Sequence, residues 1–250
     1  MQLEFLGTAG YHPSETRHTS CVLLPEAASE HAFVLDAGSG FFRMADRSLP
    51  ANLHIFLSHP HLDHVLGLTF LTDVLYRHPG CEVALYGDAR TLQAVKQTLF
   101  ASPLFPLALS CRSVEMQPRL PIQVAGVQVD SHRLTHPGGS LAYRFEWPDG
   151  KTLCYVTDTA GDAAYHEFIQ GAPDLLIHER NFSDAYPELA ATSGHCTSAH
   201  LVAAARFSGA RQVVATHFNP LTTSDPLEED GLRAQLPGLL GAFDGLKVDF

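Results

Sequence analysis

The hydrophobic residues of this chain fall into short runs that alternate between the two-residue period of strands and the longer period of helices. Strands are predicted at residues 2–6, 20–24, 32–36, 53–57, 122–129, 141–147, 152–157, 174–177 and 212–215. Helices are predicted at residues 41–46, 63–76, 88–100, 163–169 and 198–207. Two β-rich halves, each closed by helices, are typical of a four-layer αββα sandwich. Neither a linker nor a repeat interrupts this pattern, so we expect one domain over residues 1–250.

The most informative stretch is Ser-His-Pro-His-Leu-Asp-His at positions 58–64, which follows a strand-like run and precedes a helical pattern. Imidazole nitrogens and carboxylate oxygens suit borderline cations such as Zn²⁺. His59 and His61 point the same way in an extended turn, whereas Asp63 and His64 face a neighbouring position at the helix start. We therefore predict one metal position for each pair. A solvated histidine-rich loop is the alternative, but the strand-loop-helix context favours a metal site.

Composition is that of a globular protein with an ample core, since 45% of the 250 residues are hydrophobic. No apolar run reaches the ~18 residues that a membrane span needs, and no charged segment precedes an apolar stretch at the N-terminus. We therefore expect a cytoplasmic protein. The five cysteines are odd in number and form no Cys-x-x-Cys pair, which favours reduced thiols over disulfides or a thiolate zinc site.

The charge balance limits the partners that the chain can bind. Its formal net charge is −11, and it has only 16 lysines and arginines with no basic run. Long nucleic acids are held largely by cationic contacts to phosphates, so this balance excludes a protein that coats a duplex. A site for one or two phosphates needs no such excess, because a dinuclear metal centre brings its own positive charge.

Three further candidate ligands occur near strand ends. Asp158 and His217 each follow an apolar strand, and His136 lies in the loop before the strand at 141–147. A carboxylate such as Asp158 is the oxygen donor expected to bridge two metals. One such residue alone is more often a cap or a loop group. Three of them together with the cluster at 58–64 favour a shared metal site.

In this order, the motif at 58–64, His136, Asp158 and His217 resemble the metallo-β-lactamase superfamily, and the resemblance covers nearly the whole chain. Within the superfamily, the chain is similar to the ribonuclease Z group of phosphodiesterases. This closer resemblance is carried by the opening Phe-Leu-Gly-Thr-Ala-Gly to Arg17, the spacing from His136 to Tyr143-Arg144, Leu-Ile-His-Glu at 176–179, Gly-His-Cys-Thr-Ser at 194–198, and Thr-His-Phe at 216–218.

The resemblance implies an αββα metallo-β-lactamase sandwich with two divalent metal ions, most commonly zinc, with manganese or iron also accepted by such ligands. It assigns His59, His61 and His136 to one metal, Asp63, His64 and His217 to the other, and Asp158 to both. A hydroxide shared by two ions ~3.5–4 Å apart would attack phosphorus near neutral pH. Asp63 would also orient this nucleophile.

Three secondary assignments follow from the same resemblance. His195 would donate a proton to the leaving group or bind the phosphate, and Glu179 would hold its ring in position. Arg17 would contact a phosphate, with a surface ion pair as the alternative. His195 could equally be an ordinary residue of a capping loop. His132 competes with His136 as a ligand, but the seven-residue offset to Tyr143 favours His136.

Two departures from ribonuclease Z bear on the substrate. Only 22 positions separate His136 from Asp158, which leaves no room for the long arm with which many members grip tRNA. Arg180-Asn181 replaces the usual Ala-Thr. We therefore expect a small or cyclic nucleotide, a cyclic phosphate or an RNA 3′ end as substrate rather than precursor tRNA. Specificity would reside in loops such as 103–120 and 182–193.

Two other functions are compatible with the same residues. The metal centre could hydrolyse a carboxylic ester, lactone or thioester, because the same hydroxide attacks carbonyl carbons. The chain could also be a non-hydrolytic, metal-dependent ligand-binding protein. The sequence does not specify an oligomeric state, and a homodimer is the default expectation.

Overall fold

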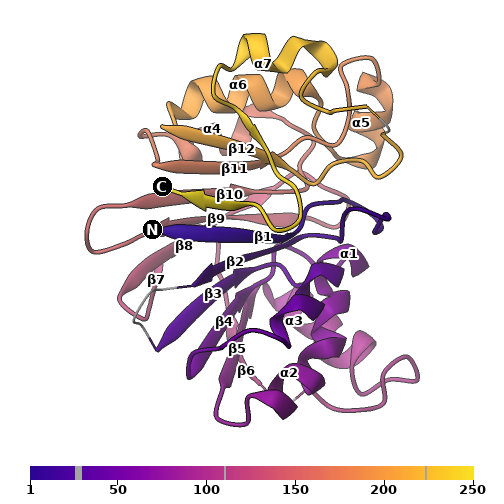
Figure 1. Cartoon of the computed structure of the whole chain (residues 1–250), viewed down its shortest axis with the longest axis vertical. Coiled ribbons are helices and arrows are strands. Elements are labelled where there is room, and N and C mark those ends of the chain that lie inside the picture. Colours follow the sequence, from indigo (N-terminus) through magenta and orange to yellow (C-terminus); the bar gives the residue numbers. More distant parts are fainter. Residues whose placement is uncertain (26–29, 110, 223) are drawn as a thin grey trace. The chain divides into compact units, whose positions relative to one another are not determined.

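The computed structural model describes residues 1–25, 30–109, 111–222 and 224–250. The chain divides into two compact units, each built on a seven-stranded mixed sheet (Figure 1). Unit 1 comprises Met1–Met116 with Asp244–Asp249, and unit 2 comprises Gln117–Phe243 with Phe250. The single domain expected over residues 1–250 stays a prediction.

The sheet of unit 1 is antiparallel at one end and parallel at the other. Its strands run in the order β14 (Lys247–Asp249), β1 (Gln2–Gly7), β2 (Cys21–Pro25), β3 (His31–Leu35), β4 (Asn52–Phe56), β5 (Glu82–Gly87) and β6 (Arg112–Glu115). The helical segments are η1 (Ser39–Met44), α1 (Leu62–Val65), η2 (Leu66–Phe70), α2 (Leu71–Arg77), α3 (Ala89–Ala94) and the π-helical η3 (Val95–Leu99).

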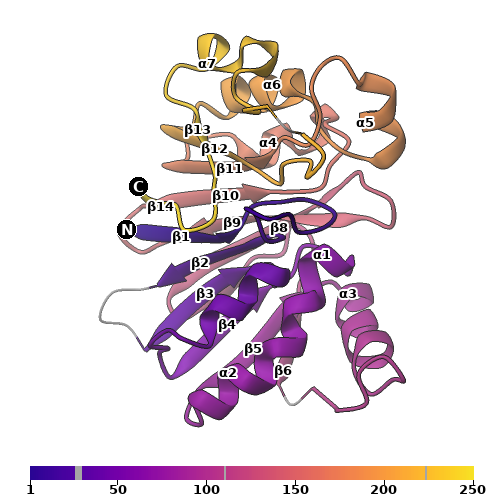
Figure 2. The same cartoon turned by 45° about the vertical axis from the view of Figure 1, so that its right-hand side comes forward.

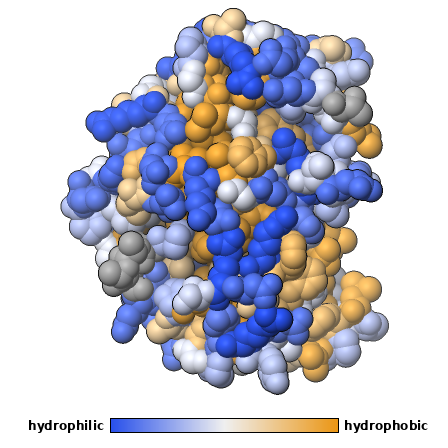
Figure 3. Space-filling model, viewed as in Figure 1, coloured by the Kyte–Doolittle hydropathy of each residue, from blue (hydrophilic) through white to orange (hydrophobic). Residues whose placement is uncertain are grey.

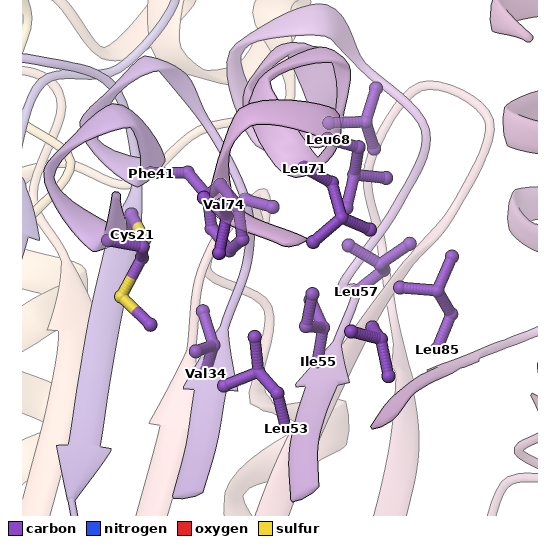
Figure 4. Packing of buried hydrophobic residues seen from close by; sticks show 14 of the residues in the cluster. Cys21, Val34, Phe41, Leu53, Ile55, Leu57, Leu68, Leu71, Val74 and Leu85 are labelled. Carbon is purple, nitrogen blue, oxygen red and sulfur yellow. The ribbon is translucent and has the colours of Figure 1, made fainter. Parts of the chain in front are cut away.

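Alternation along the strands builds the core of unit 1. Leu53, Ile55 and Leu57 are fully buried and lie on one face of β4 and its extension. Figure 4 shows them facing Leu71 and Val74 of α2, which belong to the same hydrophobic cluster. Burial of this apolar face fixes the end of β4, and therefore the start of the histidine-rich loop that follows it.

The sheet of unit 2 has the same mixture of antiparallel and parallel pairs. Its strands run in the order β13 (Leu240–Gly241), β12 (Gln212–Thr216), β11 (Leu175–Glu179), β10 (Thr152–Val156), β9 (Ser140–Glu146), β8 (Val127–Leu134) and β7 (Ile122–Val124). The helical segments are η4 (Ala163–Tyr165), α4 (His166–Ile169), α5 (Pro187–Ser193), α6 (Ser198–Ser208), η5 (Glu229–Gly231) and α7 (Leu232–Gln235).

The helices α4 and α6 cover the parallel part of this sheet (Figures 1 and 2). Tyr165 and Phe168 are buried in a cluster with Val156 of β10 and Leu176 of β11. α6 begins with a capping box, in which the Thr197 side chain accepts from the N3 backbone and the His200 side chain accepts from the Thr197 N–H. This cap fixes where α6 begins, next to the loop that carries His195.

The structure confirms most of the predicted strands and corrects one. The strand predicted over residues 122–129 is wrong, because β7 and β8 form an antiparallel hairpin there. Ala125 and Gly126 have φ of 50° and 84°, which reverses the chain between them. The strands β5 and β6 and the helix α5 were not predicted. The helix expected at 63–76 is divided into α1, η2 and α2.

Hydrophilic residues cover much of the face in Figure 3, with a hydrophobic area on the part of unit 1 where Figure 1 draws α3. In this unit Leu104 and Leu107 are 76% and 57% exposed. Across the described residues, no helix combines the length and the hydropathy that crossing a membrane requires. The five cysteines are free thiols, as predicted.

Two glycines let α1 and η2 lie directly on the loop after β3. The Gly67 N–H donates to the carbonyl of Ala37 at 2.8 Å, and the Ala37 N–H donates to the carbonyl of His64 at 2.8 Å. A Cβ at Gly67 would lie 2.1 Å from the carbonyl oxygen of Gly38, and one at Gly38 would lie 2.1 Å from the carbonyl oxygen of Asp63. The backbone of the histidine-rich motif and of η2 therefore packs directly against the backbone of the loop after β3.

We predict that Gly67→Ala lowers the free energy of unfolding by about 1–3 kcal/mol or more, because the new methyl group has no flexible neighbour that could make room for it. Urea denaturation followed by circular dichroism measures the change. Gly80→Ala is the matched control, since a Cβ there has no heavy atom within 4 Å. Equal stability of the two variants would show that the motif does not pack as closely as described.

We also predict acid destabilisation through His178, whose pKa burial lowers from 6.5 to about 4. The neutral ring fits its surroundings, because Nδ1 donates to the Glu179 carbonyl at 2.7 Å and Nε2 accepts from the Tyr165 hydroxyl at 2.8 Å. The unfolded chain therefore binds more protons, so this contribution to stability is complete above pH 6.5 and is lost as the pH falls towards 4. Urea titrations of metal-free protein should show a smaller loss over this range for His178→Gln, and an unchanged loss would contradict the assignment.

Candidate metal centre

Apart from His136, which follows the antiparallel strand β8, the candidate ligands and their neighbours in each unit follow the carboxyl ends of parallel strands. In unit 1, Asp36 follows β3 and His59 lies three residues beyond β4, its parallel neighbour. In unit 2, Asp158 follows β10, Glu179 ends β11 and His217 follows β12, and these three strands are parallel and adjacent. Parallel strands end at one edge of a sheet, so polar side chains far apart in sequence gather there.

Unit 1 brings together the four residues of the histidine-rich motif. The rings of His59 and His61 are 4.4 Å apart between centroids, and those of His59 and His64 are 4.3 Å apart. The Nε2 atom of His64 lies 3.3 Å from an Asp63 carboxylate oxygen. His59 and His64 are fully buried, whereas His61, at the N-terminus of α1, is exposed. One cluster of three imidazoles and a carboxylate results.

A carboxylate outside the motif, Asp36, orients this cluster. Asp36 is fully buried and accepts hydrogen bonds from the backbone N–H and the hydroxyl of Ser58, at 2.7 and 2.8 Å. Its Oδ2 also lies 2.8 Å from Nδ1 of His64. The Ser58 hydroxyl lies 3.0 Å from Nδ1 of His59. Partners on Nδ1 make Nε2 the nitrogen of each ring that would bind a metal, the arrangement that metal-binding histidines usually have.

The loop at residues 8–18 supplies two further contacts in unit 1. The Tyr11 N–H donates to an Asp63 carboxylate oxygen at 2.8 Å, which holds the carboxylate beside His64. Arg17 donates to the Thr8 hydroxyl at 2.7 Å, and Thr8 in turn donates to Asp244 at 2.8 Å. Arg17 therefore belongs to the loop whose backbone contacts Asp63, and its predicted contact with a phosphate stays a prediction.

Unit 2 brings together Asp158, His136 and His217. One Asp158 carboxylate oxygen lies 3.2 Å from Nε2 of His217, and the other lies 3.6 Å from Nε2 of His136. The Thr157 hydroxyl donates to the first oxygen at 2.7 Å. The side chains of all three residues are at most 2% exposed. A buried carboxylate that reaches an imidazole with each oxygen has the shape of a bridging metal ligand.

A backbone carbonyl and a side-chain amide orient the imidazoles of unit 2. Nδ1 of His136 lies 2.8 Å from the carbonyl of Gly194, so Nε2 is the nitrogen turned towards Asp158. Burial lowers the pKa of His136, which favours the neutral ring that a metal ligand requires. The Asn181 amide nitrogen donates to the carbonyl of His217 at 3.1 Å and lies 3.3 Å from Nδ1 of the same residue. Asn181 therefore fixes the backbone and the ring of His217.

Glu179 and His195 form a pair beside these ligands. Nδ1 of His195 lies 3.2 Å from the Glu179 carboxylate, and the backbone N–H groups of Thr159 and Cys196 donate to the same carboxylate at 2.6 and 3.2 Å. Glu179 is fully buried, whereas the His195 side chain is 14% exposed. The His195 ring lies 5.1 Å from that of His136 and 5.3 Å from that of His217. Glu179 thus anchors a partly exposed imidazole beside both candidate ligands, His136 and His217.

Three of these residues have backbone dihedrals that side chains other than glycine rarely adopt. The φ angles are 55° at Asp36, 35° at Asp158 and 56° at His217. Each such residue costs on the order of 1–3 kcal/mol, and such residues cluster at functional sites. Aspartate and histidine tolerate this region better than most residues. The sharp turn at each strand end carries the side chain back towards the sheet edge.

The donor set fits divalent metal ions. Two ligands that are about 2.0–2.2 Å from one tetrahedral ion lie about 3.3–3.6 Å apart. The distances from His64 to Asp63, His217 to Asp158 and His136 to Asp158 are 3.3, 3.2 and 3.6 Å. These His/Asp pairs therefore have the composition and the spacing of ligands that bind one metal ion.

The structure also separates two candidates that the sequence left in competition. His132 lies in β8, and its ring stacks on that of Phe168 in α4 with 5.4 Å between the ring centroids. His136 is the histidine that lies against Asp158. Two residues with clear positioning contacts, Asp36 and Asn181, were not predicted. The only sequence signal for Asp36 was its place at the end of an apolar strand. Asn181 was noticed only as a departure from a family pattern.

Comparison with known proteins identifies the family. The model of the β-lactamase superfamily domain matches residues 31–218. A ribonuclease Z from Synechococcus sp. strain CC9605 is 29% identical over 314 aligned positions, which cover 100% of this chain and 98% of that protein. Since this chain has 250 residues, at least 64 of those positions have no counterpart here.

Two solved structures show the same fold. The metallo-β-lactamase fold protein YhfI from Bacillus subtilis is 21% identical with a TM-score of 0.80, covering 99% of this chain and 98% of that one. A diphosphatase from the PhnP family is 21% identical with a TM-score of 0.75, covering 100% and 96%. The predicted metallo-β-lactamase fold is therefore confirmed. Together with the family match, this shows that the chain belongs to the metallo-β-lactamase superfamily and resembles ribonuclease Z within it.

Proposed function

We propose that this chain is a metal-dependent phosphodiesterase that acts on a small or single-stranded nucleotide substrate. The observation that carries the proposal is Asp158, whose two carboxylate oxygens each reach Nε2 of a buried histidine. A carboxylate in that position suits a pair of metal ions, and dinuclear sites are typical of enzymes that cleave phosphate esters. The resemblance to ribonuclease Z supports the same class of reaction.

From the resemblance to the metallo-β-lactamase superfamily, we infer that the predicted ligands hold two divalent ions. His59, His61 and His136 would bind one ion, Asp63, His64 and His217 the other, and Asp158 both. Nitrogen and oxygen donors without a thiolate suit zinc, and manganese or iron would also be accepted. When bound, two such ions activate water near neutral pH and neutralise charge on a phosphoryl group.

The chain's own residues orient the reacting groups and move the proton. Asp63, held by the Tyr11 N–H, has a carboxylate oxygen that can accept a hydrogen bond from the attacking water. His195 would donate a proton to the oxygen of the departing alcohol. Glu179, fixed by two backbone N–H groups, would hold the His195 ring and stabilise its protonated form. Arg17 would contact a nonbridging oxygen of the phosphate.

The size of the substrate follows from what this chain lacks. At least 64 aligned positions of the cyanobacterial ribonuclease Z have no counterpart here, and only 22 positions separate His136 from Asp158. With a net charge of −11, the chain also has little capacity to hold a long phosphate backbone. A cyclic or short linear phosphodiester therefore suits it better than a folded tRNA.

We predict that the wild-type protein binds two metal ions per chain and that Asp158→Asn binds one or fewer. Loss of a partner that only orients a metal ligand lowers metal affinity or activity about 10–100-fold. Loss of a shared ligand should therefore lower the rate of phosphodiester hydrolysis by about 100-fold or more. Inductively coupled plasma mass spectrometry after dialysis measures the metal, and bis-p-nitrophenyl phosphate measures activity. Asp149→Asn, on an exposed turn of the same unit, is the control. Two ions retained by Asp158→Asn would refute the bridging role.

We predict that His195→Ala slows substrates with a poor leaving group far more than substrates with a good one. Loss of general-acid catalysis costs typically 10²–10⁴-fold when the leaving group needs a proton. Hydrolysis of a dinucleotide should fall by about that factor, and release of p-nitrophenolate should fall less than about tenfold, because this anion leaves without protonation.

Glu179→Gln tests the role of Glu179 as a positioning residue. It should reduce dinucleotide hydrolysis less than His195→Ala and shift the acid side of its pH–rate profile, while the metal content stays unchanged. An equal fall for both substrates with His195→Ala would assign that histidine to substrate binding. Wild-type activity on p-nitrophenyl acetate but on no phosphodiester would favour an ester hydrolase.

A further inference from the structure

A cavity of about 330 Å³ lies within unit 2, beside the ligand His217. Its volume is at the lower end of the range for small-molecule sites, which is about 300–1,000 Å³. The residues that carry the argument come from the segment after β11 and from the segment after β12. They are Asn181, Phe182, Tyr186, Leu189, Asn219 and Leu221.

Direct contacts connect this cavity with the candidate metal centre. Asn181 lines the cavity and donates through its amide nitrogen to the carbonyl of His217. The ring of Phe182, which also lines the cavity, lies 6.3 Å from the ring of His195. A substrate whose phosphate reached His217 and His195 could therefore place an adjoining group in this cavity.

The two asparagines offer complementary hydrogen-bonding groups. The Asn181 amide nitrogen is used on His217, which leaves its carbonyl oxygen as an acceptor. In Asn219 the roles are reversed, because its side-chain oxygen Oδ1 accepts a hydrogen bond from the Leu221 N–H at 2.9 Å, and its amide nitrogen is the group left to donate. In the described part of the chain, no residue accepts from the Asn219 amide nitrogen. One acceptor and one donor match the edge of a nucleobase, which asparagine recognises in this way elsewhere.

Besides its polar residues, the cavity is lined by large hydrophobic side chains that are unusually exposed. Tyr186, Leu189 and Leu221 are 58%, 53% and 77% exposed, and they stand among the few large hydrophobic residues of unit 2 that face solvent. All three line this one cavity. Aromatic rings and apolar side chains around a polar pair are what a flat heteroaromatic ring requires, since each base has a face that stacks on an aromatic side chain.

The charge of the cavity excludes a phosphate as its occupant. Neither lysine nor arginine lines it in the described residues, and its one charged side chain is Glu229. Glu229 is bound to Arg180 at 2.6 Å and to the Ser224 hydroxyl. A phosphate would meet a carboxylate here and find no cation. An uncharged group would meet no such penalty.

We propose that this cavity binds the nucleobase of the nucleotide whose phosphodiester bond is cleaved at the metal centre. The proposal rests on the proposed function and specifies its substrate as a nucleoside phosphodiester, as opposed to a cyclic sugar phosphate or an alkyl diester. Tyr186 and Phe182 contact the face of the base, and Asn181 and Asn219 read its edge. Because backbone groups fix both asparagines, the site is formed before the ligand arrives.

Binding tests the cavity without the metal. Uridine, adenosine and ribose are titrated into chelator-treated protein and followed by ligand-observed nuclear magnetic resonance. We expect both nucleosides to bind and ribose not to bind. Tyr186→Ala should weaken nucleoside binding about fivefold or more, the effect of removing one stacking ring. Asn219→Ser removes the amide donor but keeps an acceptor for Leu221, and should also weaken binding.

The matched control is Tyr76→Ala, which removes a tyrosine that is 87% exposed in unit 1. This variant should bind nucleosides as the wild type does. Equal affinity of the wild type for ribose and nucleosides would overturn the proposal. It would also be overturned if Tyr186→Ala and Tyr76→Ala had the same effect.

Hydrolysis by metal-replete protein separates this proposal from the proposed function. We expect Tyr186→Ala to lower kcat/KM about fivefold or more for the p-nitrophenyl ester of thymidine 5′-monophosphate and to leave methyl p-nitrophenyl phosphate unchanged. An equal fall for both substrates would overturn the nucleobase site while leaving a phosphodiesterase. Wild-type protein that binds nucleosides through Tyr186 but cleaves neither diester would refute the proposed function and support the cavity as a nucleoside site.

Discussion

Buried carboxylates are stable only when other groups hold them, and the candidate metal centre depends on how this chain meets that requirement. Asp36 is fully buried, and three groups hold it: the N–H and hydroxyl of Ser58 and the ring of His64. Glu179 is held by two backbone N–H groups and by His195. Neither carboxylate is a predicted metal ligand. Each carboxylate contacts Nδ1 of a histidine, Asp36 that of His64 and Glu179 that of His195. The orientation of these two rings is therefore set by residues that are not themselves predicted ligands.

The backbone makes a second contribution to the same end. Asp36, Asp158 and His217 follow the ends of strands and have positive φ angles, a conformation that is unfavourable for residues with a side chain. The unfavourable dihedrals persist because the flanking strands are buried and paired with parallel neighbours, which leaves the backbone little freedom to relax. The strained turns direct polar side chains to the sheet edge, where a metal ion can use them. Stability of the sheets and the chemistry at their edges are therefore connected.

The dipeptide Arg180-Asn181 connects the candidate metal centre with the cavity of unit 2. Arg180 is 1% exposed and donates to Ser198, Glu229 and Asp230, which holds the start of α6 and the segment at η5 together. Asn181 contacts His217 on one side and lines the cavity on the other. A sequence feature that departs from the ribonuclease Z pattern is thus placed where it positions a candidate ligand and lines a neighbouring cavity.

The sequence by itself predicted the family and the strand-end positions of the candidate ligands, because these depend on local motifs and on the short-range period of hydrophobic residues. It suggested the pairing of Glu179 with His195 only through the family resemblance. It did not determine the hairpin of β7 and β8, where positive φ at Ala125 and Gly126 divides one apolar run into two strands. Nor did it reveal Asp36 as the partner of His64, 28 positions away, or Asn181 as the partner of His217. Such contacts depend on which strands lie side by side and on how closely glycines such as Gly67 let backbones approach, and only the tertiary structure decides these.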